Sequence, residues 1–248
     1  MLDPFETREF FHLAFLRHLA LRLAGRDYAV KGGVALRLFH GSPRLSEDLD
    51  LDAPAAIRRR TLEGAVDSVL AGAPLRADLA RQGVSLSAAS KPKQTDTTQR
   101  WKLSLEAGAG PTATKVEFSR RERTEEGERG SADARLLDRY GLPVFGARHY
   151  GRRVLMAQKV RALAAPGRSA ARDLFDLEHL RAREPEARSV LAALPEALRR
   201  AAAEKVLAFG YADFAGQVAP FLTLEAREAY DEAAFERLQE AAVGALLP

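Results

Sequence analysis

The segment from Asp48 to Asp52 carries acidic side chains at alternating positions, Asp-Leu-Asp-Leu-Asp. Alternate residues of an extended strand share one face, so we expect the carboxylates of Asp48 and Asp50 about 6 to 7 Å apart, with the leucines facing the core. Like charges at this spacing repel, and they raise each other's pKa unless a cation lies between them. Because Mg²⁺ favours one or two carboxylates with phosphate oxygens and water, the pattern predicts metal-assisted phosphoryl transfer. The alternative is an edge strand that displays charge to solvent.

Two glycines precede the acidic segment. Gly32 and Gly33 follow the apolar run 28–30 and come before residues 34–39, whose spacing is helical, so we predict a strand-to-helix turn there. Backbone amides at such a turn can bind phosphate, and glycine allows a positive φ and close approach of a ligand. Arg44 and Ser46 could add a guanidinium and a hydroxyl to a triphosphate site, or serve as surface and turn residues.

The order of these motifs resembles a known family. Residues 31–33 (Lys-Gly-Gly), a short helix and residues 44–51 (Arg-x-Ser-x-Asp-Leu-Asp-Leu) are similar to the first motif of the AbiEii-type nucleotidyltransferase toxins, relatives of the MenT toxins in the polymerase β-like superfamily. Residues 115–119 (Lys-Val-Glu-Phe-Ser) resemble the strand that carries the third acidic position. Residues 156–163 and 172–177 resemble the helical Lys and Arg-Asp motifs.

The resemblance implies an α+β fold. It places a small mixed β-sheet nucleotidyltransferase core flanked by helices in residues 1–150, and a helical C-terminal domain in residues 151–248. Glu117 would be the third carboxylate, with Glu106 on the neighbouring predicted strand as the alternative. Lys159 would neutralise phosphate charge and Asp173 would fix Lys159 or the base; the alternative is an ordinary buried Lys–Asp pair.

The resemblance also implies roles for individual residues. The catalytic residues would be Asp48, Asp50, Glu117, Lys159 and Asp173. The metal ligands would be Asp48, Asp50 and Glu117, holding Mg²⁺ or Mn²⁺. The nucleotide-binding residues would be Lys31, Gly32, Gly33, Arg44 and Ser46.

The activity that the resemblance implies is Mg-dependent transfer of a nucleoside monophosphate from a nucleoside triphosphate (NTP) to an RNA acceptor, such as the 3′ end of tRNA, with release of pyrophosphate. The chain would then be the toxin of a bacterial toxin-antitoxin system, with a cognate antitoxin protein as partner. Two alternatives stay open: nucleotidylation of a protein or small molecule, and a non-catalytic module that binds nucleotide or RNA. The sequence does not choose the base, the acceptor, the oligomeric state or the regulator.

Composition indicates a globular protein. The chain has 248 residues, of which 46% are hydrophobic, enough for one large domain or two small ones. Since it has neither an apolar run of about 18 to 20 residues nor a signal-peptide pattern, we expect a cytoplasmic protein without a membrane partner. The absence of cysteine excludes disulfides and thiolate metal sites. The five histidines show no paired ligand spacing, so we expect surface or capping roles for them.

The net charge of +4 and the pI near 9.5 favour a polyanionic partner. Arginines cluster at 58–60, 120–123 and 152–153, each beside a proposed motif segment. Each cluster is either a solvated charged face, which is the usual case for a run of charge, or a contact surface for RNA. The loop predicted over 120–130 is rich in charge and could be a lid or only a solvated loop.

Hydrophobic periodicity and breaker residues predict a small mixed sheet with helices, followed by an almost wholly helical region after about residue 150. The predicted strands are 28–31, 48–52, 84–90, 100–107 and 113–119. The predicted helices are 7–23, 33–39, 55–71, 153–164, 169–182, 187–208 and 223–244, with breaks at Pro166, Pro195 and Pro220.

Overall fold

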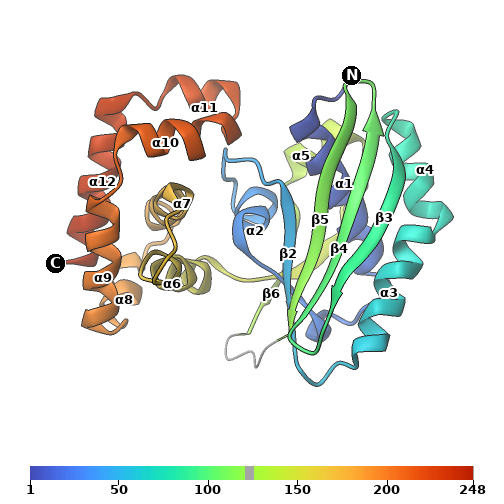
Figure 1. Ribbon diagram of the computed structural model, residues 1–248, viewed down its shortest axis with the longest axis horizontal. Helices are drawn as coiled ribbons and strands as arrows, with labels where there is room; N and C mark the ends of the chain where they lie inside the picture. The colour runs from blue at the N-terminus through green and yellow to red at the C-terminus, as the bar shows by residue number, and fades with distance from the viewer. Residues whose placement is uncertain (121–125, 248) are drawn as a thin grey trace. The chain divides into compact units, whose positions relative to one another are not determined.

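The computed structural model describes residues 1–120 and 126–247 (Figure 1). The chain divides into two compact units. The first comprises Met1–Gly41 and Leu45–Tyr150, and the second comprises Ser42–Arg44 and Gly151–Pro248. Arginines 121 and 123, and the centre of the loop predicted over 120–130, lie outside the described residues.

A seven-stranded mixed sheet forms the first unit, in the order β3-β4-β5-β2-β1-β7-β6. Strands β2 and β5 pair parallel, as do β1 and β7, and the remaining pairs are antiparallel. The α+β class expected from the sequence is therefore confirmed. The strands are β1 (Ala29–Val30), β2 (Asp48–Ala53), β3 (Ser85–Gln94), β4 (Thr98–Ala107), β5 (Gly110–Arg120), β6 (Glu128–Ser131) and β7 (Gly146–His149).

Helices cover this sheet, and α1 supplies much of the core. Its aromatic side chains Phe10, Phe11 and Phe15 are fully buried, and it contacts β4, β5, α3 and α4. Helix α2 contacts β2 instead, and Figure 1 shows it on the opposite side of the sheet from α3 and α4. The helices are α1 (Pro4–Leu19), α2 (Gly32–Phe39), α3 (Arg59–Ala71), α4 (Ala73–Arg81) and α5 (Ala134–Tyr140), with a 3₁₀ turn η1 (Gly25–Asp27).

The second unit is helical, as expected. Helices α6 and α12 each contact α7 and α9, around a cluster of aromatic rings that includes Phe175, Phe214 and Phe235. The short segment 42–44 joins this unit because Thr223 N donates to Pro43 O at 3.1 Å. The elements are α6 (Arg152–Leu163), α7 (Ala171–Arg181), α8 (Ala187–Ala192), α9 (Glu196–Leu207), α10 (Tyr211–Gln217), η2 (Ala219–Phe221), α11 (Leu224–Glu228) and α12 (Glu232–Leu246).

Several elements differ from the sequence prediction. Helix α3 ends at Ala71 as predicted, but a helix that was not predicted, α4, begins at Ala73, with Pro74 in its first turn, where proline has no hydrogen bond to lose. Strand β6 (Glu128–Ser131) begins inside the predicted loop 120–130 and pairs with β7; neither strand was predicted. In the part of the chain that the structure describes, no helix is long and apolar enough to cross a membrane.

Candidate active site

The acidic strand β2 lies in register with β5. Asp48 is beside Lys115, and Asp50 is beside Glu117, on parallel neighbouring strands. The aspartates of β2 are half-buried while the residues between them are fully buried, so the predicted alternation of faces is confirmed. Neighbours in register on a sheet share a face. The three carboxylates proposed from the sequence therefore lie on one surface.

Glu106, the alternative third carboxylate, is elsewhere on the sheet. It pairs with Ser85 of β3 and Pro111 of β5, near the end of β4, and its carboxylate accepts from Ser87 Oγ at 3.3 Å. The structure thus brings Glu117, and not Glu106, beside Asp50.

Two of the three carboxylates already have a cation. Lys115 Nζ lies 2.9 Å from Asp48 Oδ2, and Arg100 of β4 donates to Glu117. The Glu117 carboxylate raises the pKa of Arg100 by accepting its hydrogen bond. Burial disfavours the charge on Lys115, but the hydrogen bond and the charge of Asp48 outweigh burial and raise the pKa of Lys115. Both cations are therefore fully charged near neutral pH.

Asp50 is different. None of the described basic side chains forms an ion pair with it. Burial raises the pKa of Asp50, Lys115 opposes that shift, and the neighbouring Asp48 and Glu117 add to it. Asp50 is therefore a half-buried carboxylate that has two carboxylates as neighbours and no ion pair with a described basic residue. A cation beside Asp50 would offset the repulsion within the acidic face, which consists of Asp48, Asp50 and Glu117.

The glycine turn lies directly against this carboxylate. Lys31 is the N-cap of α2, its backbone N–H donates to Asp50 O at 3.0 Å, and Gly32 begins the helix with a φ of +67°. A Cβ atom at Gly32 would lie 3.6 Å from Asp50 Oδ2. The first amides of a helix have no intrahelical acceptor and favour anions. Gly33 lies in the same first turn, so the expected strand-to-helix turn is present beside Asp50.

The remaining aspartate of β2, Asp52, is held from two directions. Lys31 Nζ pairs with its carboxylate and also donates to Ser119 Oγ at 2.8 Å. The Tyr150 hydroxyl donates to Asp52 Oδ2 at 2.9 Å. Asp52, itself held by Tyr150, fixes Lys31 at the start of α2. Asp52 belongs to the alternating acidic pattern of the sequence, but no role was predicted for it or for Tyr150.

Ser46 and Arg44 make different contacts from one another. Ser46 Oγ donates to the backbone oxygen of Asp48 at 3.0 Å and so supports the start of β2. Arg44 belongs to the second unit, where it is buried and donates from Nε and Nη2 to Asp176 at 2.8 and 2.7 Å. Because its guanidinium is engaged in this bidentate pair, the geometry does not favour the predicted triphosphate contact of Arg44.

Lys159 and Asp173 belong to the same buried network. Lys159 Nζ lies 2.8 Å from Asp173 Oδ1 and 2.6 Å from Asp176 Oδ2. Arg168 Nη2 lies 2.6 Å from Asp173 Oδ2. Burial opposes the charge of Asp176, but Arg44 and Lys159 reverse the effect and lower its pKa strongly. The second unit thus contains a buried ion-pair network in which Lys159 and Asp173 have structural partners.

Sequence reasoning did not single out Arg168 of this network, and it also missed Asp176. Asp176 follows Asp173 by three residues, which places both carboxylates on one face of α7. That spacing was the available signal.

The expectation that all five histidines are surface or capping residues is wrong. His12, His149 and His179 are buried. His12 Nε2 lies 2.9 Å from Thr114 Oγ1, and burial, with the charge of Arg8, lowers its pKa to about 3. Buried histidines come from several segments, and no spacing pattern revealed them.

The basic clusters predicted from the sequence are only partly exposed. Arg120 is buried and donates to Ile57 O, and Arg153 pairs with Glu184 and Glu186. The cluster at 58–60 is exposed. Three arginines that are far apart in the sequence, Arg26, Arg129 and Arg148, line a cavity of about 490 Å³ in the first unit.

The sequence matches a family model described as "Nucleotidyl transferase AbiEii toxin, Type IV TA system" over residues 14–247. No protein with a curated description matches it. Two crystal structures of Helicobacter pylori proteins share its fold. JHP933 is 20% identical with a TM-score of 0.61, covering 99% of this chain and 94% of that chain. A candidate nucleotidyltransferase is 22% identical with a TM-score of 0.58, covering 95% and 94%.

Proposed function

The chain belongs to the AbiEii family of nucleotidyl transferase toxins, and we propose that it transfers a nucleoside monophosphate from an NTP to an RNA acceptor, such as the 3′ end of tRNA. The observation that carries the proposal is the register of β2 and β5, which puts Asp48, Asp50 and Glu117 on one surface. The first turn of α2, with Gly32, lies against Asp50 on the same surface.

The residues present fit a divalent cation. Asp48, Asp50 and Glu117 offer only oxygen donors, which Mg²⁺ and Mn²⁺ prefer over nitrogen or sulfur. The carboxylate in the middle, Asp50, has no ion pair with a described basic residue, and burial raises its pKa. Bound Mg²⁺ would neutralise the triphosphate and the developing charge on the leaving pyrophosphate.

The other side chains have roles that follow from their positions. The amides of Gly32 and Gly33 would donate to the β and γ phosphate oxygens, since they begin a helix beside Asp50. Lys31, held by Asp52, would add positive charge at the same helix terminus. Ser46 keeps the start of β2 in place through its bond to Asp48 O.

The acceptor hydroxyl would attack the α-phosphorus in line with the leaving group. A new bond forms between the acceptor oxygen and phosphorus, and the bridging bond to the β-phosphate breaks with loss of pyrophosphate. Glu117 would orient the hydroxyl and accept its proton as a general base. We assign no direct part in this step to Lys159 and Asp173, whose ion pairs lie within the second unit; their predicted catalytic roles stay predictions.

An RNA acceptor is supported by charge. The pI is near 9.5, the arginines at 58–60 are exposed, and Arg26, Arg129 and Arg148 line one cavity of the unit that carries the acidic face. Guanidinium groups bind phosphate oxygens well, and often bidentately. We further propose that the toxin acts in the cytoplasm and is neutralised by a cognate antitoxin protein, as the family description suggests.

The proposal is tested by incubating the purified chain with Mg²⁺, total tRNA and each labelled NTP in turn, and following the label on a denaturing gel. We expect labelled tRNA with at least one NTP, and none with the Asp48→Ala/Asp50→Ala double variant. Pyrophosphate release without labelled tRNA would move the acceptor to a protein or small molecule. Absence of transfer, together with absence of Mg-dependent nucleotide binding, would refute the catalytic assignment.

A matched pair of variants tests the third carboxylate. Glu117→Gln should lower the rate by about 10²-fold or more, the range typical of losing a general base. Glu106→Gln lies on the adjacent strand β4, so it should leave the rate unchanged. Equal losses in both variants would remove Glu117 from the proposed site.

A further inference from the structure

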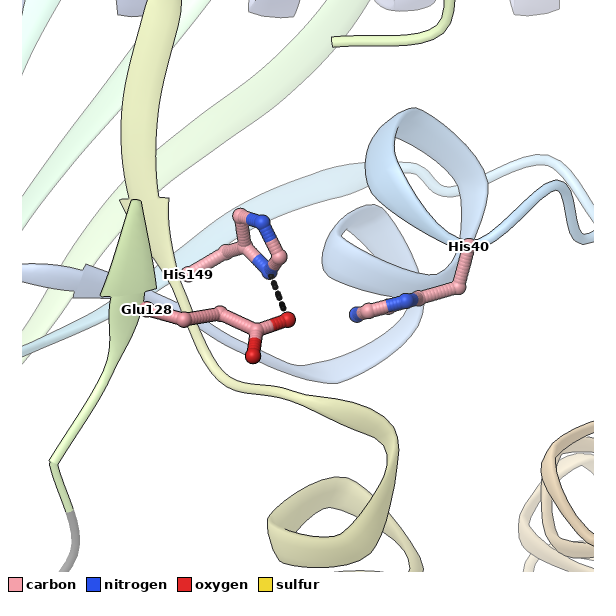
Figure 2. A group of neighbouring side chains, drawn as sticks. All are labelled: His40, Glu128 and His149. Atoms are coloured by element: carbon pink, nitrogen blue, oxygen red, sulfur yellow. Dashed lines mark ion pairs between the residues drawn. The ribbon is translucent and has the colours of Figure 1, made fainter. Parts of the chain in front are cut away.

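Three side chains from separate elements of the first unit converge near the end of α2. His40 is the C-cap of α2, Glu128 begins β6, and His149 ends β7. Glu128 and His149 are partners across the β6–β7 pair. Each of the three offers a ligand atom, and these atoms lie within 4.8 Å of one another. Figure 2 shows the His40 ring directed from the end of the helix toward the other two side chains.

The His149 ring is held in one orientation. It is buried, and it stacks on Phe39 with 4.2 Å between ring centroids and 17° between planes. Gly130 on β6 provides its space, since a Cβ atom there would lie 2.4 Å from His149 Nε2. The Nδ1 edge then faces Glu128 Oε1 at 3.9 Å. The absence of a side chain at Gly130 is therefore needed for this arrangement.

A backbone oxygen completes the cluster. His40 Nε2–H donates to Tyr150 O at 2.9 Å, and His149 Nδ1–H donates to the same oxygen at 3.1 Å. Ligands of a tetrahedral ion with bonds near 2.0 to 2.1 Å are about 3.3 Å apart. The two nitrogen–oxygen distances are a few tenths of an ångström below this spacing, and the 3.9 Å from His149 Nδ1 to Glu128 Oε1 is about 0.6 Å above it. Shifts of that size are ordinary for side chains that close around an ion.

The donors favour a different metal from that of the acidic face. Imidazole nitrogen suits Zn²⁺, Co²⁺ and other transition ions, whereas Mg²⁺ prefers oxygen ligands. Metal binding would displace the protons that the two ring nitrogens donate to Tyr150 O, because a ligating imidazole nitrogen must be deprotonated.

We propose that His40, Glu128 and His149 bind a transition-metal ion, with Zn²⁺ as the expected occupant, at a site separate from the acidic strand. Three protein ligands leave a further position for water or for the Tyr150 carbonyl. The ion would tie the β6–β7 pair to the end of α2. Since the Tyr150 hydroxyl donates to Asp52, the same residue joins this cluster to strand β2.

The test is Co²⁺ and Zn²⁺ binding to the full chain, without an affinity tag and after removal of metal with a chelator. We expect one Co²⁺ per chain, with the intense visible absorption of a four- or five-coordinate ion, and displacement of Co²⁺ by Zn²⁺. Glu128→Gln and His40→Gln should each weaken binding by at least about tenfold. Both residues are accessible enough for substitution without opening the core, because Glu128 is exposed and His40 is half-buried.

Two controls separate this site from other metal binding. Glu126→Gln removes an exposed carboxylate two residues away and should bind Co²⁺ as the native chain does. The Asp48→Ala/Asp50→Ala double variant should also keep the Co²⁺ spectrum, because the proposed site does not use those carboxylates. The proposal is overturned if the native chain takes up no Co²⁺, or if Glu128→Gln and His40→Gln bind it as tightly as the native chain.

Discussion

Removing the charge of Asp176 should strongly destabilise the second unit. Its side chain is fully buried, accepts two hydrogen bonds from Arg44 and lies 2.6 Å from Lys159 Nζ. Asp176→Asn keeps the shape but leaves two buried cations short of a counter-charge. Loss of one partner from a buried ion pair costs roughly 3 to 5 kcal/mol. Because Asp176 serves two cations, we expect a loss of about 4 kcal/mol in the free energy of unfolding.

The assay is chemical unfolding followed by circular dichroism, with separate fits if the two units unfold in separate transitions. The matched control is Glu186→Gln, which removes an exposed carboxylate from its pair with exposed Arg153 and should change little. Arg44 and Lys159 lower the pKa of Asp176 in the folded chain below its value of about 3.9 in the unfolded chain. The contribution of Asp176 to the free energy of unfolding is therefore fully present above about pH 4 to 5, and it is lost as the pH falls toward the folded pKa. The difference between native and variant should therefore be constant from about pH 5 to 8. A loss below about 1 kcal/mol would refute the reasoning.

Three further predictions concern the first unit. Gly32→Ala should lower the free energy of unfolding by about 1 to 2 kcal/mol, because a φ of +67° is unfavourable for alanine. Gly64→Ala should raise it by up to about 1 kcal/mol, because alanine has the higher helix propensity within α3. Equal effects of the two variants in thermal unfolding would contradict this. Tyr150→Phe, which removes the bond to Asp52, should cost about 1 kcal/mol in chemical unfolding, and an unchanged midpoint would show that the bond adds nothing. The pKa of His12 is about 3 in the folded chain and about 6.5 in the unfolded chain, so the unfolded chain binds the proton first as the pH falls. The free energy of unfolding should therefore fall by about 2 kcal/mol between pH 7.5 and pH 5. In His12→Gln this dependence of the unfolding free energy on pH should disappear.

The local features of the acidic face were predictable from the sequence. Alternation in 48–52 gave β2 with its correct faces, and the glycine pair gave the turn with positive φ at Gly32. Both features depend on the backbone of a few adjacent residues. The α+β class followed from the short strands and the helical C-terminal region.

Contacts between distant segments were not predictable. Arg44 precedes the acidic strand by four residues, yet its partner Asp176 lies 132 residues away in sequence. His40, Glu128 and His149 come from three segments with no shared spacing, and strand pairing alone brings two of them together. Helix α4 was not predicted, because a proline shortly after a helix end is typical of a turn and equally fits the first turn of a new helix, so the local signal at Pro74 was ambiguous.

The central claim is that the acidic face of β2 and β5 transfers a nucleotidyl group. It is tested most directly by giving the chain Mg²⁺, tRNA and the preferred NTP, labelled either at the α-phosphate or at the γ-phosphate. The account predicts that only the α label reaches the tRNA, that pyrophosphate is released in equal amount, and that the Asp48→Ala/Asp50→Ala double variant does neither. Transfer of the γ label, or transfer that survives in the double variant, would contradict it.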